Sequence, residues 1–249
     1  MNLITRLYGR IMAVWAIIIF IITMIPAYLI IWMSGIFKEP KSSTAHKWIS
    51  HVWMRIFFFL TGCSLFRRGK NNFEKGLNYI VICNHNSLMD VPVTTPFIPG
   101  PANKTIAKIE MAKTPLFGLI YKRGSVLVDR NDKKSRADSF IKMKRVLEMG
   151  LHMCIYPEGT RNKTDQPLKE FHDGAFRLAI ETGKPIMPAL LFNTKKVLDP
   201  DRGFYFFPSR MEMHFLKPFK VYPEDDVASL REKSSKLMTD YYVQHYKPS

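Results

Sequence analysis

The hydrophobic pattern of the chain changes at about residue 70. Two long apolar stretches come before that point, and short apolar runs separated by segments of helical periodicity follow it. Short buried strands that alternate with helices are typical of α/β domains. The pattern therefore predicts a hydrophobic helical region over residues 1–68, followed by a single α/β domain over residues 69–249 with a mostly buried mixed sheet flanked by helices.

The first apolar stretch runs from Ile11 to Phe37 and holds 27 residues without a charge. As a straight helix it would measure about 40 Å, which exceeds the roughly 30 Å of a bilayer's hydrocarbon core. Pro26 removes an intrahelical hydrogen bond near its middle, so a bent, re-entrant insertion is an alternative to spanning. A cleaved signal peptide fits less well, because the run is too long and no A-x-A site follows it. We expect a membrane-associated segment.

The second apolar stretch, His46 to Phe66, has the spacing of an amphipathic helix. Its apolar positions include Trp48, Trp53 and Phe57, with Lys47 and Arg55 on another side. Such a helix can lie in a membrane interface or pack as an ordinary helix on the core of the domain. The sequence leaves both environments open.

Short apolar runs after residue 70 predict strands and helices in alternation. The strands are expected at Leu77–Cys83, Lys104–Ile109, Ser125–Val128, Leu151–Tyr156, Pro185–Phe192 and Met211–Leu216. The helices are expected at Arg136–Met149, at Gly174–Glu181 with a stop at Gly183, and at Val227 to about Tyr242.

The charge is strongly positive, with 37 Lys and Arg against 21 Asp and Glu and a formal net charge of +16. An anionic partner is therefore expected, which can be nucleic acid, anionic lipid or a phosphorylated substrate. Ten basic residues and only two acidic ones lie within residues 1–75, beside the apolar stretches, which suits a membrane surface. No nucleic-acid-binding motif is recognised, so we expect membrane lipids and no nucleic acid as partners.

The three cysteines, Cys63, Cys83 and Cys154, lie far apart and form no CxxC pair. They indicate buried thiols in a reducing compartment. More basic residues follow the first apolar stretch than precede it, and the positive-inside tendency places them in the cytoplasm. We therefore expect the α/β domain on the cytoplasmic face of a membrane.

The predicted strand Leu77–Cys83 is followed by NHNSLMD, which holds His85 and Asp90. Residues five apart differ by about 140° around a helix, so these side chains meet only if one lies outside it. With His85 before a helix and Asp90 in its first turns, the carboxylate can accept the Nδ1 proton and aim Nε2 at a substrate as a base. A histidine of the core would show the same letters, so the pair is weak evidence by itself.

Ser87 is a candidate nucleophile in the same stretch, but helix capping is the interpretation that we favour. No G-x-S-x-G elbow surrounds it. If the protein supplies a base and no nucleophile, the nucleophile belongs to the substrate, and a hydroxyl is the natural choice.

Other predicted strands also end in polar clusters. YPEGTRN at Tyr156–Asn162 joins a carboxylate, a glycine, a hydroxyl and a guanidinium, which suits the binding of a phosphate. VLVDRND at Val126–Asp132 ends a strand in charge, and KPIMPAL at Lys184–Leu190 is a strand interrupted by Pro188. Since α/β folds bind ligands beyond the carboxyl ends of strands, these clusters predict a shared cleft.

In order and spacing, NHNSLMD, VLVDR, YPEGTR and IMPA resemble the four blocks of the 1-acylglycerol-3-phosphate acyltransferase family, across about residues 80–192. The resemblance implies transfer of a fatty acyl group from acyl-CoA or acyl carrier protein to the free sn-2 hydroxyl of lysophosphatidic acid, giving phosphatidic acid. It implies that His85 is the general base, that Asp90 orients it, and that the glycerol phosphate is bound by Glu158, Gly159, Thr160 and Arg161. It also implies Arg130 near the phosphate, with Lys108 as a further basic candidate.

Two positions depart from the family pattern. Tyr156 stands where the family often has Phe, and His172 stands where Lys is common, which puts a phosphate role for His172 in doubt. No metal or other cofactor is implied, and the seven histidines show no zinc-like spacing. The same chemistry on another acceptor, such as lyso-ornithine lipid or glycerol 3-phosphate, is an alternative, and an inactive membrane scaffold is another.

Overall fold

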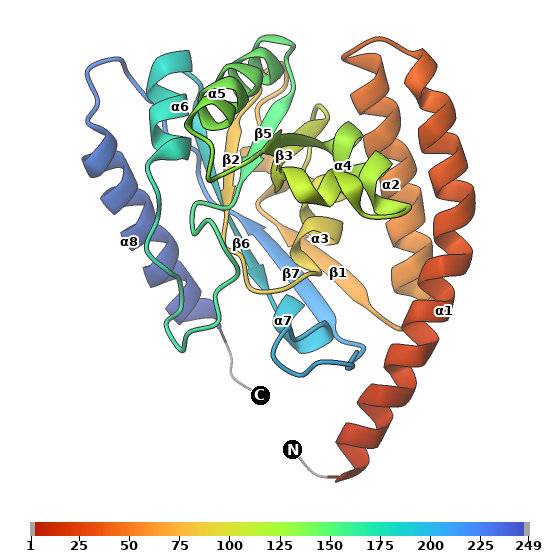
Figure 1. The fold of residues 1–249 in the computed structure, drawn as a ribbon. Coiled ribbons are helices and arrows are strands. Elements are labelled where there is room, and N and C mark those ends of the chain that lie inside the picture. Colours follow the sequence, from red (N-terminus) through yellow and green to blue (C-terminus); the bar gives the residue numbers. More distant parts are fainter. Residues whose placement is uncertain (1–2, 247–249) are drawn as a thin grey trace.

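The structure is a computed structural model and describes residues 3–246. At its centre is a seven-stranded sheet in the order β1-β7-β6-β2-β5-β3-β4 (Figure 1). The strands are β1 (Ser64–Arg68), β2 (Ile80–Cys83), β3 (Asn103–Lys108), β4 (Ser125–Val128), β5 (His152–Ile155), β6 (Ile186–Phe192) and β7 (Arg210–Phe215). Only the β6–β7 pair is antiparallel. The predicted mixed α/β fold is confirmed.

Helices cover both faces of the sheet. They are α1 (Leu3–Met33), α2 (Lys41–Leu60), α3 (Asp90–Phe97), α4 (Phe117–Gly124), α5 (Lys133–Glu148), α6 (Gly174–Thr182), α7 (Thr194–Val197) and α8 (Val227–His245). The core on one face joins Val81 and Cys83 of β2 to α1, α2 and α3, and the core on the other joins Ile80 and Ile82 to α5, α6 and α8. Because side chains alternate along a strand, a sheet buried on both faces needs strands without polar positions.

The six predicted strands correspond to β2 through β7. β4 has the expected bounds, and the other five differ at their ends by one to three residues. Helix α5 begins at Lys133, earlier than expected, because the Asp132 carboxylate caps it by accepting from the amides of Lys134 and Ser135. The hydrophobic pattern therefore located the elements, and the capping residue set the start of this helix.

The second apolar stretch divides into two elements. α2 ends at Leu60, Gly62 follows with φ of 70°, and Ser64–Arg68 forms β1, which pairs with β7. The prediction of one helix through Phe66 is wrong, because a glycine in the left-handed region ends the helix and a distant strand recruits the next residues. The sheet thus begins at Ser64, on the N-terminal side of the predicted boundary at residue 68.

α1 is continuous through Pro26 and packs along α2. The Trp15 indole Nε1 donates to Leu60 O at 2.9 Å, and the Trp53 Nε1 donates to Thr23 Oγ1 at 3.0 Å. Residues 3–36 form the only helical segment among the described residues that is long and apolar enough to cross a membrane. This apolar helix does not stand alone, because it packs on α2 to form a helical pair.

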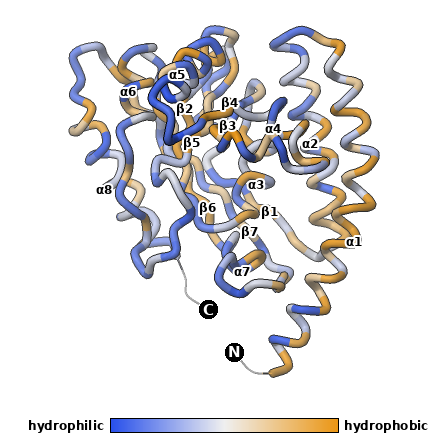
Figure 2. Tube along the Cα trace, in the orientation of Figure 1, coloured by the Kyte–Doolittle hydropathy of each residue, from blue (hydrophilic) through white to orange (hydrophobic). Residues whose placement is uncertain are grey.

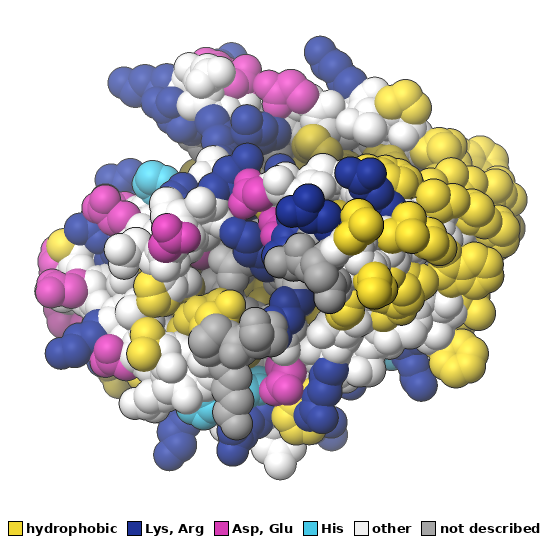
Figure 3. Space-filling view, turned by 90° about the horizontal axis from the view of Figure 1, so that it is seen from below, with side chains coloured by type: hydrophobic (Ala, Val, Ile, Leu, Met, Phe, Trp, Pro, Cys, Tyr) yellow, Lys and Arg dark blue, Asp and Glu magenta, His cyan; other side chains and the backbone are white. Residues whose placement is uncertain are grey.

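The outer side of the helical pair is apolar. α1 exposes large aliphatic residues such as Ile18, Ile22 and Leu29, and α2 exposes Trp48 and Phe59. The hydropathy colouring shows α1 as hydrophobic over most of its length, and hydrophobic side chains gather on one side of the molecule (Figures 2 and 3). Of the two environments considered for α2, packing on the core of the domain is observed for its other face, where Ile49 and Phe57 among others are buried. The membrane interface stays a prediction for the exposed face.

Candidate active site

Four neighbouring parallel strands bring the predicted site residues to one edge of the sheet. His85 follows β2 and the block that begins at Tyr156 follows β5, which is the neighbour of β2. Lys108 ends β3, and Arg130 follows β4, the next strands in the sheet. Parallel strands place their carboxyl ends together, which explains why residues far apart in sequence share this edge.

His85 and Asp90 are hydrogen bonded, with 2.8 Å between Nδ1 and Oδ2. A carboxylate only accepts, so Nδ1 carries the proton and Nε2 keeps its lone pair. Asp90 is fully buried and is the first residue of α3, where the helix dipole favours a negative charge. The His85 side chain is 18% exposed, and no described residue forms a hydrogen bond with its Nε2. The histidine is therefore oriented and open to a ligand.

The turn before α3 is fixed by the same carboxylate oxygen. Asp90 Oδ2 also accepts from the amides of Asn86 at 2.6 Å and Ser87 at 2.7 Å. The Ser87 hydroxyl donates to Leu198 O at 2.6 Å and accepts from the Met89 amide at 3.0 Å. Ser87 is buried and bound on both sides, as a residue that shapes a helix start requires.

The backbone of His85 is held by the block after β5. Its amide donates to Glu158 Oε1 at 2.7 Å, and its carbonyl accepts from the Asn162 amide at 2.6 Å. Glu158 Oε2 accepts from the Lys169 amide at 3.1 Å, and the residue is 1% exposed. Burial raises the pKa of Glu158 to about 7, against the opposing effect of these amide donors. Glu158 thus ties the end of β5 to the end of β2.

The next two residues of this block lie at the surface. Gly159 has φ of 70°, and a Cβ at this position would lie 2.7 Å from Cδ2 of His172, so the left-handed backbone and the close ring both favour glycine. The Gly159 carbonyl accepts a hydrogen bond from Arg130 Nη1. Thr160 is exposed, and its hydroxyl accepts from Lys169 Nζ at 2.7 Å. Polar groups of three segments therefore surround this turn.

Arg161 and Lys108 lie at the same edge without contacts to the histidine. The guanidinium of Arg161 forms no hydrogen bond or ion pair among the described residues, and its charge acts on Tyr121 of α4. Burial nevertheless raises the pKa of Tyr121. Lys108 is exposed at the end of β3, opposite Val128 of β4. Both cations are available to an anionic ligand.

Tyr156 forms one wall beside the histidine. Its ring stacks on the His85 imidazole with 4.4 Å between ring centroids and 29° between planes. Its hydroxyl and Thr94 Oγ1 are 2.7 Å apart in a hydrogen bond. An aromatic ring at this position fixes the plane of the imidazole, and the hydroxyl ties that ring to α3.

Sequence reasoning missed three residues that build this edge. Asn84 continues the β2–β6 ladder with its side chain, accepting from the Leu191 amide at 2.7 Å and donating to the Leu191 carbonyl at 3.1 Å. Asn162 and Lys169 are the other two, through the contacts given above. Asn84 is the first residue of NHNSLMD and Asn162 the last of YPEGTRN, which was the available signal, whereas nothing in the sequence marks Lys169.

The chemistry of the edge is that of a base beside anion-binding groups. Among residues 3–246, no three His, Cys, Asp or Glu side chains are grouped so that they could hold a metal ion. The cations Arg130, Arg161, Lys169 and Lys108 suit a phosphate, and His85 suits the removal of a proton from a hydroxyl.

Comparisons with known proteins agree with this geometry. A 1-acyl-sn-glycerol-3-phosphate acyltransferase from Helicobacter pylori is 29% identical over 191 residues, covering 76% of this chain and 78% of the relative. One from Haemophilus influenzae is 26% identical over 206 residues, covering 81% and 82%. The crystal structure of the 1-acyl-sn-glycerophosphate acyltransferase PlsC from Thermotoga maritima has the same fold, with a TM-score of 0.80, 18% identity, and coverage of 98% of this chain and 100% of that one.

The family model described as Acyltransferase matches residues 64–191. This range begins at β1 and includes His85, Asp90 and the block from Tyr156 to Asn162. The resemblance found in the four sequence blocks is confirmed, and the chain belongs to the acyltransferase family.

Proposed function

We propose that the protein transfers a fatty acyl group from an acyl thioester to the free sn-2 hydroxyl of 1-acyl-sn-glycerol 3-phosphate. The names of the relatives support this acceptor. The observation that carries the chemistry is the hydrogen bond from His85 Nδ1 to Asp90 Oδ2, which leaves Nε2 free to accept a proton.

In the proposed reaction, His85 Nε2 takes the proton of the acceptor hydroxyl while the oxygen attacks the thioester carbonyl. The tetrahedral intermediate collapses, the carbon–sulfur bond breaks, and the thiolate leaves with the proton from His85. The charge of Asp90 stabilises the imidazolium between these steps, as a carboxylate does for histidine in serine hydrolases. Oxygen acylation therefore needs a base and no protein nucleophile.

We propose that the cations at this edge bind the phosphate of the acceptor. Arg161, Arg130 and Lys108 supply positive charge at the edge, and the Thr160 hydroxyl, bound to Lys169 Nζ, precedes Arg161 in the chain. Glu158 was expected among these ligands, but its buried carboxylate already binds two amides, so we assign it as a positioning residue for His85. Fixing both reactants in this way can supply about 7–11 kcal/mol of the barrier reduction.

We propose that the protein lies on the cytoplasmic face of a membrane through the apolar outer side of α1 and α2. Contacts hold α1 to the domain over much of its length, since Gly9 O accepts from the Phe206 amide at 3.0 Å and Thr23 accepts from Trp53. These contacts favour a helix that lies beside the domain in one leaflet over one that leaves the domain and spans. The lipid acceptor and product would then reach the edge from the membrane.

The test uses the purified full-length protein in detergent with lysophosphatidate as acceptor, and with acyl-CoA and acyl carrier protein as donors in parallel. His85→Ala is the control, and we expect phosphatidate only from the unmutated protein. Lyso-ornithine lipid and glycerol 3-phosphate are tested beside it, and preferential turnover of either would replace the proposed acceptor. Folded protein without any product would favour the inactive scaffold.

A further inference from the structure

The outer face of α5 is basic with an apolar residue at its centre. α5 packs on the sheet through Met143, Val146 and Leu147, and it turns its other side to solvent. The exposed residues of α5 include five cations, one aliphatic residue and two acidic residues. The cations and the aliphatic residue, called here the α5 surface, are Lys133, Lys134, Arg136, Ile141, Lys142 and Arg145, and the acidic residues beside them are Asp138 and Glu148. Ile141 is 50% exposed. The exposed side of α5 therefore carries a net positive charge around a hydrophobic point.

The stability of α5 does not explain these charges. Lys133, Lys134 and Arg136 lie in the first turn, which holds no acidic residue. Cations at a helix N-terminus oppose the helix dipole, so they weaken the helix rather than stabilise it. Arg145, in the last turn, is the only member whose position suits the dipole. Charges that cost stability suggest a role outside the fold.

The α5 surface begins at the edge that carries the histidine. Arg136 Nη1 donates to the Arg130 carbonyl at 2.7 Å, and Arg130 Nη1 donates in turn to Gly159 O. Glu158, the neighbour of Gly159, holds the backbone of His85. The start of α5 is thus linked to the proposed site of acyl transfer by a short chain of contacts through Arg130, Gly159 and Glu158.

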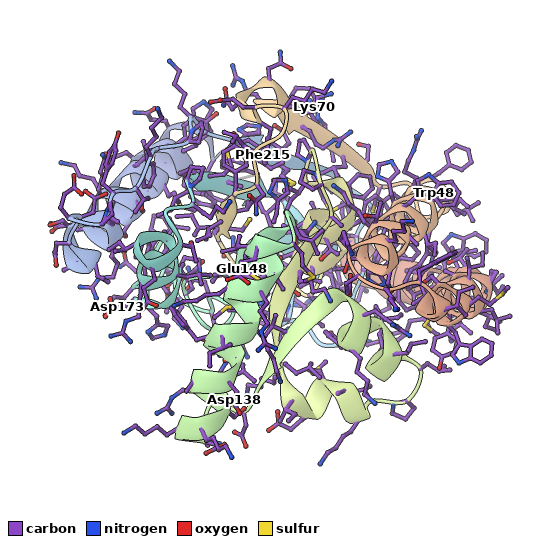
Figure 4. The ribbon with its side chains drawn as sticks, turned by 90° about the horizontal axis from the view of Figure 1, so that it is seen from above. Trp48, Lys70, Asp138, Glu148, Asp173 and Phe215 are labelled. Atoms are coloured by element: carbon purple, nitrogen blue, oxygen red, sulfur yellow. The ribbon has the colours of Figure 1, made fainter. Side chains whose placement is uncertain are left out.

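The α5 surface is separated from the apolar side of the molecule. Seen from above, Trp48 on α2 lies at the right of the molecule, and α5 runs from Glu148 near the centre to Asp138 at the lower edge (Figure 4). The two helices also pack on opposite faces of the sheet. A membrane bound to α1 and α2 therefore leaves α5 to a partner from solution.

We propose that the α5 surface binds an acidic acyl carrier protein that delivers the acyl thioester, an inference that rests on the acyl transfer proposed above. Lys134 and Arg145 are separated by about 16 Å along the helix. A protein can contact both residues at once, whereas one small anion cannot. The cations complement an acidic protein and steer its approach, and Ile141 provides an apolar contact inside a charged rim.

The test compares donors in the full-length protein. The double variant Lys134→Glu/Lys142→Glu changes two cations that have no assigned role in catalysis. We expect kcat/KM with the acyl carrier protein donor to fall about tenfold or more, through KM, and kcat/KM with acyl-CoA to change less than about twofold. Glu at position 134 suits a helix N-terminus, so Tm should not fall.

Two further variants make the result specific. Lys75→Glu/Lys236→Glu makes the same change in net charge at exposed positions outside the α5 surface, and it should leave both donors unaffected. Ile141→Ser changes no charge and should weaken only the carrier-protein reaction. Binding to anionic vesicles is measured for each variant alongside activity.

The proposal is overturned if kcat/KM of Lys134→Glu/Lys142→Glu falls equally with both donors or with neither. It is also overturned if the unmutated protein uses acyl-CoA alone, or if Lys75→Glu/Lys236→Glu loses as much activity with the carrier protein. A loss of vesicle binding that tracks the loss of activity would assign the α5 surface to the membrane and overturn it too. If the unmutated protein makes no product from either donor, the proposed function fails. The docking proposal is then tested by titrating the protein directly with acyl carrier protein. Binding that is lost in Lys134→Glu/Lys142→Glu supports the docking proposal, and binding that is absent or unchanged overturns it.

Discussion

The two halves of the candidate site are built differently. In the buried half, Asp90 and Glu158 are almost inaccessible, and together they accept five hydrogen bonds, four of which hold His85 and its turn. In the other half, the side chains of Arg161 and Lys108 form no hydrogen bonds with described residues, and the Thr160 hydroxyl forms one. The groups that we propose for proton transfer are fixed before the substrate arrives, which is where preorganisation matters most. The groups that we propose for anion binding are left for the substrate to order, which costs affinity.

The largest effect should come from Asp90→Asn. Three donors converge on Oδ2, and Oδ1 is buried without a hydrogen-bond partner among the described residues, so the amide oxygen of Asn can take the Oδ2 position. The tautomer of His85 is then kept and only the charge is lost. We expect kcat to fall about 10²- to 10³-fold, or about 3–4 kcal/mol, with KM little changed. Steady-state kinetics measures both.

Asp90→Ala is the matched control, because it removes the three hydrogen bonds together with the charge. It should lose stability as well as activity, whereas Asp90→Asn should lose activity with a smaller change in Tm. Equal stability losses in the two variants would show that the buried half is held by the charge and not by its hydrogen bonds.

Glu158→Gln should alter the pH dependence of stability. The pKa of Glu158 is raised from 4.5 to about 7, so the folded state binds this proton more tightly than the unfolded chain does. The unmutated protein therefore loses about 2–3 kcal/mol as pH rises from 4.5 through 7, and Gln removes this loss. One amide donor also loses its acceptor in the variant, at a cost of about 1–3 kcal/mol. The deficit of Glu158→Gln should shrink from pH 5 to pH 8 in denaturant unfolding, and a constant deficit would contradict the burial of a titrating carboxylate.

Arg161→Ala tests the half proposed for anion binding. Its loss should raise KM for the phosphorylated acceptor about tenfold and leave kcat within about threefold, because the contact is equal in the ground and transition states. Arg161→Lys keeps the charge without the planar fork, so its KM should lie between those of the unmutated protein and Arg161→Ala. A fall in kcat that matches Asp90→Asn would place Arg161 with the catalytic half, and the comparison would break down.

The smallest effect should come from Tyr156→Phe. The stack on His85 remains, and only the hydrogen bond to Thr94 is lost. Unfolding free energy should fall by about 1 kcal/mol with kcat within about twofold. Tyr156→Leu, which removes the aromatic wall, should lower kcat further if the stack holds the imidazole plane, and identical kcat values in both variants would remove Tyr156 from the positioning set.

The same division describes what the sequence could predict. His85, Asp90 and the turn between them are local, so helical geometry allowed their contact to be expected, and the resemblance of the four blocks gave the pair its role. β4 and the central strands followed from apolar runs, because burial on both faces leaves no polar positions.

Long-range contacts were the part that could not be predicted. β1 has alternating partial exposure and becomes a strand by pairing with β7, almost 150 residues later. The carboxylate of Glu158 was expected to face a phosphate, yet its partners are two backbone amides. The amide of His85 is brought near by the pairing of β2 with β5, and the amide of Lys169 by the loop that follows the block. Lys169 has no sequence signal because an irregular loop carries it to Thr160.

The packing of Gly9 against Tyr205 has a consequence for biosynthesis. The Tyr205 ring lies where a Cβ of residue 9 would be, and the Phe206 amide donates to the Gly9 carbonyl. A ribosome adding about 5–20 residues per second reaches Tyr205 roughly 10–40 s after Gly9. During that interval the apolar α1 has no native partner from the C-terminal part of the sheet. Until then only α2 is available to pack on the nascent helix, and the apolar surface that the C-terminal part will cover stays exposed unless lipid or a chaperone covers it.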